Sequence, residues 1–414
     1  MHRSFTMLLV FCGILFGQEN FSGRLSLSSF ANYADGLSDR NSLRLKPRLS
    51  FKAENISDTK LILTGYLNAD YRQYEKNNKS STSKYLRIYD LALSYKYNDN
   101  TSITLGRKIN PKISSIGVVD GLQFDKTWNK FSAGTVIGSR PDIVDFGLNT
   151  KLFESGFYLG YAQNNHQSSV ALIQQMNGKS VDRRSLYLTH FNRLSDKFRY
   201  YFNTDIDLYK NINGEPSSIF RLTGLYLSAT YRPMKKISFT SSYNSRKNII
   251  YYETFKTYAE QLYDDETRKG LKFRINWRPL RLIYLGTNMG YRFKNSDDRS
   301  SFNYNYYLGH SNIPKLKIST RFTASQITSN YLDGNIFDIY LSKPLFNNRI
   351  NLSSNFKYMK YDYINSGNSL IQRQFTGDIS WQLKSKMSFT LSYLGSFEQS
   401  VDYNQIYLVV SQRF

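Results

Sequence analysis

The chain contains very little cysteine and histidine. Its one cysteine, Cys12, lies in the first stretch, which we expect to be removed, so disulfides and thiolate metal sites are excluded from the mature protein. The histidines beyond that stretch, His166, His190 and His310, show no metal-ligand spacing. This excludes a structural zinc site, and we expect neither a metal nor a cofactor.

Long hydrophobic runs are also missing from most of the chain. A basic start, an apolar run from Phe5 to Gly17 and a polar exit are typical of a cleaved secretory signal peptide, which we assign to residues 1–17. A lipoprotein signal at Cys12 is the weaker alternative, because bulky Phe11 precedes it. From Glu19 onward no apolar run approaches the ~18 residues that a membrane helix needs, which excludes a helical membrane protein.

Sequence breaks that would divide the chain into domains are absent too. No Pro/Gly/Ser-rich linker or composition shift interrupts residues 18–414, so we predict one continuous domain. The chain has a formal net charge of +23, but 16% of its residues are aromatic, far too many for a disordered basic tail. Stacked rings and basic charge would suit single-stranded nucleic acid. The export signal argues against that partner.

The motifs of the common enzymes are missing. Thr189 precedes His190, and His310 precedes Ser311, but neighbours in a strand point to opposite faces, so neither pair forms a dyad. The Gly-x-Ser-x-Gly elbow, nucleotide-binding loops and paired metal motifs do not occur. We expect no enzymatic activity and assign no catalytic residue.

What the sequence does contain is alternation with period two along nearly its whole length. In residues 350–358 the side chains of Ile350, Leu352 and Phe356 share one face, opposite Asn351 and Lys357. Similar alternation recurs in residues 43–52, 271–278 and 387–398. This pattern predicts an all-β protein. The mean hydropathy of −0.50 still fits a membrane barrel, because only alternate residues of a barrel meet lipid.

Alternation alone also fits a soluble sandwich or propeller, but three further features favour a membrane barrel. Many strands reach the ~9–11 residues that cross a bilayer at a tilt. Connections alternate between tight and long, and tyrosines gather at strand ends, as interfacial girdles would require. The tight turns are at residues 98–100, 232–235, 278–280 and 384–386, and the longer loops at residues 75–83, 244–267 and 365–368.

The last ten residues form an alternating strand that ends in an aromatic residue. The segment resembles the C-terminal strand of bacterial outer-membrane β-barrel proteins, whose closing aromatic is part of the signal read by the barrel-assembly machinery. Ile406, Leu408, Val410 and Phe414 match that pattern, whereas Gln412 places an amide where an apolar residue is usual. The resemblance implies insertion into the outer membrane of a Gram-negative-type bacterium, among lipid and lipopolysaccharide.

The count of alternating segments sets the size of the barrel. It gives 22 or 23 strands, and a single-chain barrel is expected to have an even number. We therefore predict a single antiparallel barrel of about 22 strands, with 18–24 compatible with the pattern. The ambiguity lies in residues 131–176, where the strands are short and one segment has the option of folding inward.

If the apolar faces meet lipid, the opposite faces line the lumen and carry many basic residues. This predicts a porin-like channel for small polar or anionic solutes, because an excess of one charge in a narrow pore enriches counter-ions. Charge at the rims, contacting lipopolysaccharide, is the alternative reading, and a non-conducting barrel in a secretion, assembly or uptake complex is the alternative function. The lumen candidates are Arg44, Lys46, Arg48, Lys272, Arg274, Arg278, Lys315, Lys317, Arg321, Arg349 and Lys357.

Two loops remain to be interpreted. Residues 110–120 are less polar than an exposed loop, which indicates either a constriction folded into the lumen or a tip buried against its own wall; the candidates are Ile113, Ile116, Val118 and Val119. The loop at residues 244–267 contains clustered carboxylates. These favour a solvated acidic loop over a Ca²⁺ site.

Overall fold

The computed structural model describes residues 20–35, 41–76, 79–143, 145–212, 215–247, 267–294, 299–364, 366–398 and 401–414. The predicted signal peptide, residues 1–17, lies outside the described residues, and so do residues 248–266 with their clustered carboxylates. Among the described residues no helix is long and apolar enough to span a membrane.

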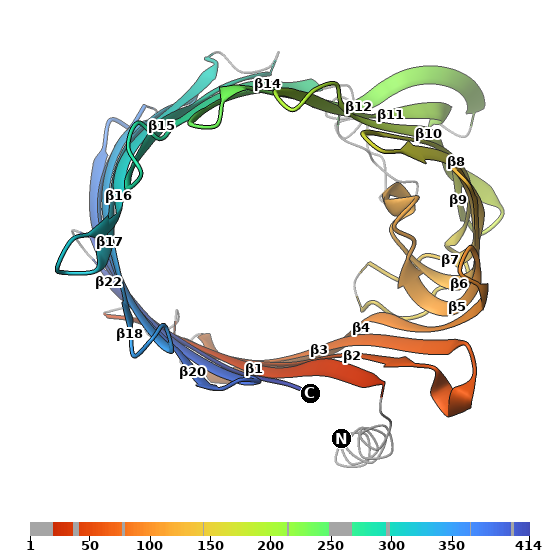
Figure 1. Ribbon diagram of the computed structural model, residues 1–414, viewed down its shortest axis with the longest axis horizontal. Coiled ribbons are helices and arrows are strands. Elements are labelled where there is room, and N and C mark those ends of the chain that lie inside the picture. Colours follow the sequence, from red (N-terminus) through yellow and green to blue (C-terminus); the bar gives the residue numbers. More distant parts are fainter. Residues whose placement is uncertain are drawn as a thin grey trace.

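The described residues form 22 antiparallel strands arranged around a closed ring (Figure 1). Two 3-10 helices lie in the connections, η2 (Ile56–Asp58) and η3 (Ser114–Ile116). The strands are β1 (Phe21–Ala34), β2 (Ser42–Glu54), β3 (Leu61–Lys76), β4 (Lys79–Asn98), β5 (Thr101–Ile109), β6 (Val118–Trp128), β7 (Phe131–Ser139), β8 (Phe153–Gln163), β9 (His166–Asn177), β10 (Ser180–Arg193), β11 (Phe198–Ile212), β12 (Glu215–Met234), β13 (Ile237–Lys247), β14 (Thr267–Trp277), β15 (Ile283–Lys294), β16 (Ser301–Ile313), β17 (Ile318–Thr328), β18 (Leu332–Leu345), β19 (Ile350–Tyr363), β20 (Ser369–Lys384), β21 (Met387–Phe397) and β22 (Asp402–Arg413).

The ring is closed by pairing between its first and last strands. Each strand pairs with the next one in sequence, and β22 pairs back with β1, with Leu27 opposite Val410. No described strand is left with an unpaired edge, as a sheet in a bilayer requires. The prediction of a 22-stranded barrel is confirmed, and the ambiguous residues 131–176 provide β7, β8 and most of β9.

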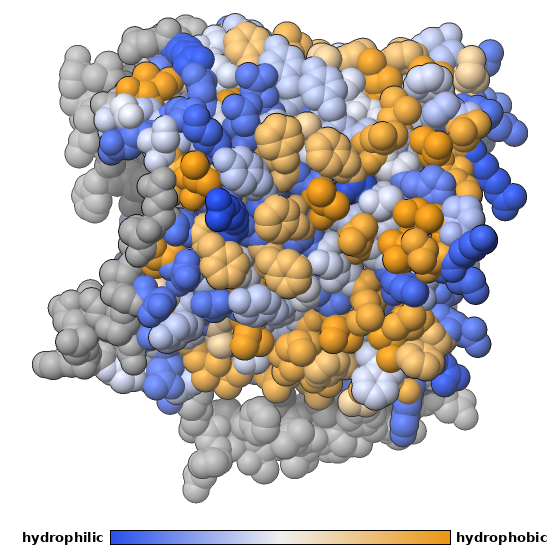
Figure 2. Space-filling view, turned by 90° about the vertical axis from the view of Figure 1, so that its left-hand side faces the viewer, coloured by the Kyte–Doolittle hydropathy of each residue, from blue (hydrophilic) through white to orange (hydrophobic). Residues whose placement is uncertain are grey.

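The outer face of the ring is apolar. Leu105, Leu122 and Ile137 stand side by side on β5, β6 and β7, and their side chains are 61%, 49% and 47% exposed. Ile339, Phe356 and Phe375 form a similar exposed row across β18, β19 and β20. Figure 2 shows apolar residues spread over this wall. Exposed apolar rows of this extent indicate a hydrocarbon environment.

The connections sort into two ends, as the sequence predicts. Those following even-numbered strands are two to six residues long and form what we call the turn rim. The opposite end, the loop rim, contains the longest connections, including residues 140–152, but also short ones, such as those between β9 and β10 and between β17 and β18. The predicted loop at residues 75–83 differs from the structure, because β3 extends to Lys76 and β4 begins at Lys79.

Aromatic residues on the outer face gather near the turn rim. Trp128 lies 6.4 Å from Phe131, and Phe131 lies 5.3 Å from Tyr161, measured between ring centroids. Adjacent tyrosines of the predicted girdles, however, point to opposite faces. Tyr200 packs beside His190, whereas the next residue, Tyr201, lines a pocket inside the ring. Of these two tyrosines, only Tyr200 stands on the outer side of the wall.

Candidate functional site in the barrel lumen

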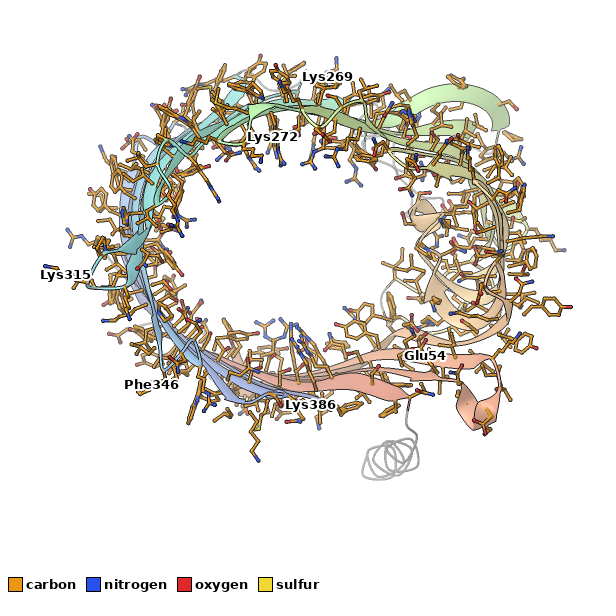
Figure 3. The ribbon with its side chains drawn as sticks, in the orientation of Figure 1. Glu54, Lys269, Lys272, Lys315, Phe346 and Lys386 are labelled. Atoms are coloured by element: carbon orange, nitrogen blue, oxygen red, sulfur yellow. The ribbon has the colours of Figure 1, made fainter. Side chains whose placement is uncertain are left out.

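The inward face of each strand follows from strand register. Figure 3 shows Lys272 on the inner side of the ring, opposite in direction to Lys269. Arg274 and Asn276 share the face of Lys272, because side chains two residues apart in a strand point the same way. Register pairs Asn276 with Gly286, and Gly286 with Tyr307, which carries the inward face onto β15 and β16.

The first basic arc of the lumen lies on β2, β3 and β4. Arg44 makes a bidentate ion pair with Asp70, with Nε 2.7 Å from one carboxylate oxygen, and Lys46 Nζ lies 3.8 Å from the same carboxylate. One acidic group is thus shared by two cations. Arg72 lies beside Arg44 in the register between β2 and β3.

Next to this ion pair, a row of three polar side chains crosses β2, β3 and β4. Arg48 pairs in register with Asn68, and Asn68 pairs with Arg87, so the amide stands between two guanidinium groups. The Nε atoms of both arginines and the Oδ1 atom of Asn68 are buried without a hydrogen-bond partner. Buried donors of this kind are normally satisfied by water or by a ligand.

The second basic arc lies across the lumen on β14 to β19. Arg274 Nε donates a hydrogen bond of 2.6 Å to Asn288 Oδ1, and the Arg321 guanidinium lies 5.5 Å from the centre of the Tyr340 ring. Lys357 stands opposite Asp338 in register. A groove of about 610 Å³ runs over these strands and is lined by Tyr307, Arg321, Asp338 and Lys357, among others.

The remaining basic candidates lie at the turn rim. Arg278 follows the end of β14, Lys315 and Lys317 lie between β16 and β17, and Arg349 lies between β18 and β19. Figure 3 shows Lys315 on a turn at the outer side of the ring. The eleven candidates therefore divide between seven strand residues and four turn residues.

A buried ionic network, which was not predicted, occupies the inner wall at β10 to β12. Arg183 Nη2 lies 2.7 Å from Asp207 and 2.9 Å from Asp205, and Arg221 Nη2 lies 3.3 Å from Asp207. The Asp207 side chain is almost fully buried. Here two arginines meet two aspartates, so the charges balance, whereas in the first basic arc two cations share the single carboxylate of Asp70.

The connection between β5 and β6 folds inward against the wall (Figure 1). Three of the four constriction candidates, Ile113, Ile116 and Val119, are buried with Val136 and Tyr158 of the barrel wall in one apolar cluster. The fourth candidate, Val118, is half-buried. The loop thus forms the one apolar core among the described residues.

Small and polar groups of the wall fix this loop. A Cβ atom on Gly156 would stand 2.7 Å from Ile113 Cδ1, so any larger residue there would displace the end of the isoleucine side chain. Asn110 Nδ2 donates to Asp125 at 3.1 Å, and the Tyr158 hydroxyl donates to the same carboxylate. The loop is therefore held by both packing and hydrogen bonds.

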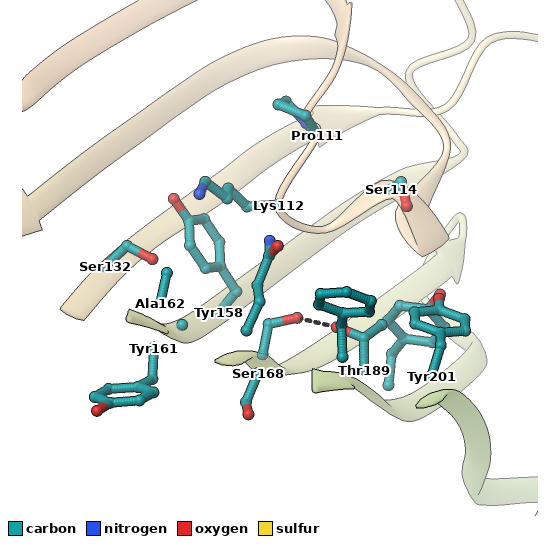
Figure 4. A pocket seen from close by; sticks show the side chains of 15 residues that line it. Pro111, Lys112, Ser114, Ser132, Tyr158, Tyr161, Ala162, Ser168, Thr189 and Tyr201 are labelled. Carbon is teal, nitrogen blue, oxygen red and sulfur yellow. Dashed lines mark hydrogen bonds between the residues drawn. The ribbon is translucent and has the colours of Figure 1, made fainter. Parts of the chain in front are cut away.

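A pocket of about 230 Å³ lies between this loop and the wall (Figure 4). Its lining includes Lys112 of the loop and Tyr158, Tyr187 and Tyr201 of the wall. Ser169 and Thr189 also line the pocket, and their hydroxyl groups are hydrogen-bonded at 2.6 Å. The pocket offers aromatic faces, hydroxyl groups and one cation.

The residues of the predicted assembly signal lie at the closing strand. Ile406, Leu408 and Val410 share one face of β22, and Ile406 is exposed on the outer side of the ring. The ring of Phe414 stacks on that of Phe21 with centroids 5.0 Å apart. The last aromatic residue thus packs against the start of the first strand.

Comparison with solved structures finds several chains of similar length and fold, of which we report three. The P pilus usher (PapC) translocation pore has a TM-score of 0.52 to this chain at 11% sequence identity, over 95% of this chain and 99% of that one. Acinetobacter baumannii OccAB4 has a TM-score of 0.47 at 12% identity, over 96% and 99%. Pseudomonas aeruginosa OccK7 (OpdD) has a TM-score of 0.48 at 10% identity, over 95% and 99%.

At sequence identities this low, the similarity to these structures concerns the fold alone. No protein-family model matches the sequence, and no curated protein matches it either. The closed ring of 22 strands with its apolar outer face is therefore a β-barrel whose fold is similar to that of the usher pore.

Proposed function

We propose that this protein is an outer-membrane channel for passive diffusion of small polar or anionic solutes through a basic lumen. The observation that carries the proposal is the row of Arg48, Asn68 and Arg87, in which two guanidinium groups keep donor atoms without a protein partner. A hydrated anion supplies the acceptors that these donors lack. Low-dielectric walls strengthen the attraction, because they focus the field of the fixed charges.

The second basic arc supports the same proposal from the other side of the lumen. Arg321 and Lys357 line a groove that also contains polar tyrosine and asparagine side chains, so a solute meets cations together with neutral hydrogen-bonding groups. In Figure 3 the drawn side chains of opposite walls stay apart. The pocket beneath the inward loop, with Lys112 and its tyrosines, would be a resting place for a small aromatic or hydroxylated anion.

The route to the membrane is part of the proposal. Residues 1–17 would direct export and be cleaved, residues 18–414 would form the barrel, and Ile406, Leu408, Val410 and Phe414 would be read by the barrel-assembly machinery. The outward placement of the β22 apolar face and the packing of Phe414 at the closure support this role. Lipopolysaccharide would contact the loop rim, because short turns face the periplasm in barrels of this class.

Planar-bilayer recording of the double variant R48Q/R87Q tests the channel. At ~7 Å in water a fixed positive charge lowers the energy of a passing anion and raises that of a passing cation by about 0.6 kcal/mol each. Losing two charges should therefore change the anion-to-cation energy difference by about 2.4 kcal/mol and lower the permeability ratio up to about 50-fold at low salt. The matched control K60Q/K130Q removes two charges from the turn rim and should leave the ratio unchanged.

Reversal potentials under a KCl gradient give this ratio directly. Cation preference in the unmodified protein would remove the anionic part of the proposal. No conductance from pure protein, together with stable partners in native membranes, would favour a barrel that serves a secretion, assembly or uptake complex.

A further inference from the structure

The turn rim divides into two halves that differ in charge. The five turns after β2, β4, β6, β8 and β10 contain three basic and three acidic residues. The five turns after β12, β14, β16, β18 and β20, which we call the basic turns, contain eight basic residues and no acidic one. These eight are Lys235, Lys236, Arg278, Arg281, Lys315, Lys317, Arg349 and Lys386.

The basic side chains of these turns are exposed and form no ion pairs with other described residues of the protein. Lys236 makes one hydrogen bond of 3.3 Å, to the backbone carbonyl of Pro279 in the next basic turn. This contact brings the charges of two neighbouring turns together.

Apolar side chains stand at the same turns. Met234, Leu280, Leu316 and Phe346 are 60%, 61%, 54% and 73% exposed. Leu316 lies directly between Lys315 and Lys317 in the sequence. Alternating cations and exposed apolar groups match a bilayer interface, where the apolar groups enter the acyl boundary and the cations reach the headgroups.

The basic turns also have the right position for a bilayer surface. Figure 3 shows Lys315 and Phe346 on the outer side of the ring, away from the lumen. Figure 2 shows hydrophilic residues along the right-hand edge of the wall, next to the apolar residues of its outer face. Trp277, exposed on the outer face, immediately precedes Arg278, as an interfacial aromatic residue would.

We propose that the basic turns bind the headgroups of anionic phospholipids and so gather these lipids around one half of the barrel. The partner is a lipid because the turns that contain Lys315 and Phe346 point outward and exposed apolar side chains stand at the basic turns, whereas an acidic soluble protein would need neither feature. The phosphate-bearing headgroup is the acceptor, and each lysine or arginine near an anionic surface adds attraction that falls off within a Debye length.

The chain provides its own reporters for this proposal. It contains three tryptophans, and all three are exposed on the outer face beside turns. Trp277 adjoins a basic turn, whereas Trp128 adjoins the turn of residues 129–130 in the charge-balanced half. The variants W128F/W381F and W277F/W381F therefore each keep one reporter, one for each half of the rim.

The experiment places both single-tryptophan variants in phosphatidylcholine vesicles that contain one-fifth phosphatidylglycerol. Brominated acyl chains are carried by either lipid in turn, and quenching of tryptophan fluorescence gives the local preference between them. We expect Trp277 to prefer phosphatidylglycerol at least threefold more than Trp128 does. The preference should fall toward that of Trp128 in the charge-neutral variant R278Q/R281Q/K315Q/K317Q and at high salt.

The matched control K60Q/K130Q/K197Q removes three cations from the balanced half and should leave the preference at Trp277 unchanged. Equal preferences at Trp277 and Trp128 in unmodified turns would overturn the proposal, whatever the variants do. A preference at Trp277 that survives both neutralisation and high salt would overturn it as well, because charge would then not be its cause. The salt series needs no variant of the turns, so it decides the matter even where the neutral variant does not fold.

Discussion

Replacing Ile113 by alanine should release the inward loop while the barrel stays closed. Ile113 is fully buried and fills the space above Gly156. Truncating a buried isoleucine costs about 2–5 kcal/mol. The strands β5 and β6 keep their mutual register, so the cost falls on the docking of residues 110–117. At 1.4 kcal/mol per factor of ten, the undocked population should rise at least about 30-fold.

Thiol modification of a cysteine at position 116 measures this population. Ile116 is 3% exposed, so a thiol there reacts only when the loop opens. With Cys12 also replaced by serine, I116C is the only thiol of the chain. When reclosing is fast, the rate of modification is proportional to the open population. The control I137A truncates an isoleucine on the outer face and should leave the rate unchanged.

A rate in I113A within threefold of the reference would contradict this reasoning. Packing of Ile113 would then not hold the loop, and the hydrogen bonds from Asn110 and Tyr158 to Asp125 would have to do so. The two cases separate in D125N, which weakens the hydrogen bonds and leaves the apolar cluster in place. Heat-modified gel mobility shows whether each variant remains a closed barrel.

Three further outcomes are expected. Deleting residues 113–118 should raise single-channel conductance in planar bilayers if the loop narrows the path, and unchanged conductance would show that it only covers the wall. Arg183→Gln should lower the free energy of unfolding in urea by about 3–5 kcal/mol, because Asp207 is left buried with a weaker partner; equal unfolding midpoints would refute the network's role. Phe414→Ser should slow refolding into vesicles, followed by gel mobility, because it removes the stacking on Phe21; an unaltered rate would count against it.

The strand count and the two faces of each strand could be read from the sequence, because most strands alternate over nine or more residues. In β14, Leu271 and Phe273 lie outward and Lys272 inward, as their order predicts. The sequence also predicted which connections are short, since Asn98 to Asn100 and Lys384 to Lys386 combine turn residues with a break in alternation. Physical periodicity therefore determines most of the architecture.

The exact strand ends and the position of some basic residues could not be predicted. Near the ends of strands, polar residues occur on both faces, so polarity no longer indicates which way a side chain points. Residues 75–83 are polar on both faces, so no apolar pattern marks the end of β3 at Lys76 or the start of β4 at Lys79. Lys315 and Lys317 keep the alternation that leads to Arg321, but a turn separates them from the strand and carries them to the rim.

The ionic network was missed for a related reason. Register shifts lie between Val181 and Arg183 and on either side of Asp207 in the pairing of β11 with β12. Such irregularities change which side chains meet, and no single-sequence pattern marks them. A cluster of opposite charges in the middle of neighbouring strands was the available signal.

The pairing of β22 with β1 has a consequence for how the chain can fail. Every other pair joins neighbours in sequence, but this one joins the two segments that are furthest apart along the chain. A truncated chain without its last strand would therefore be an open sheet rather than a slightly narrower barrel. Its two edge strands would expose unpaired backbone groups that can pair with a second copy of the chain. Loss of β22 should therefore disturb the closed ring more than the shortening of any loop.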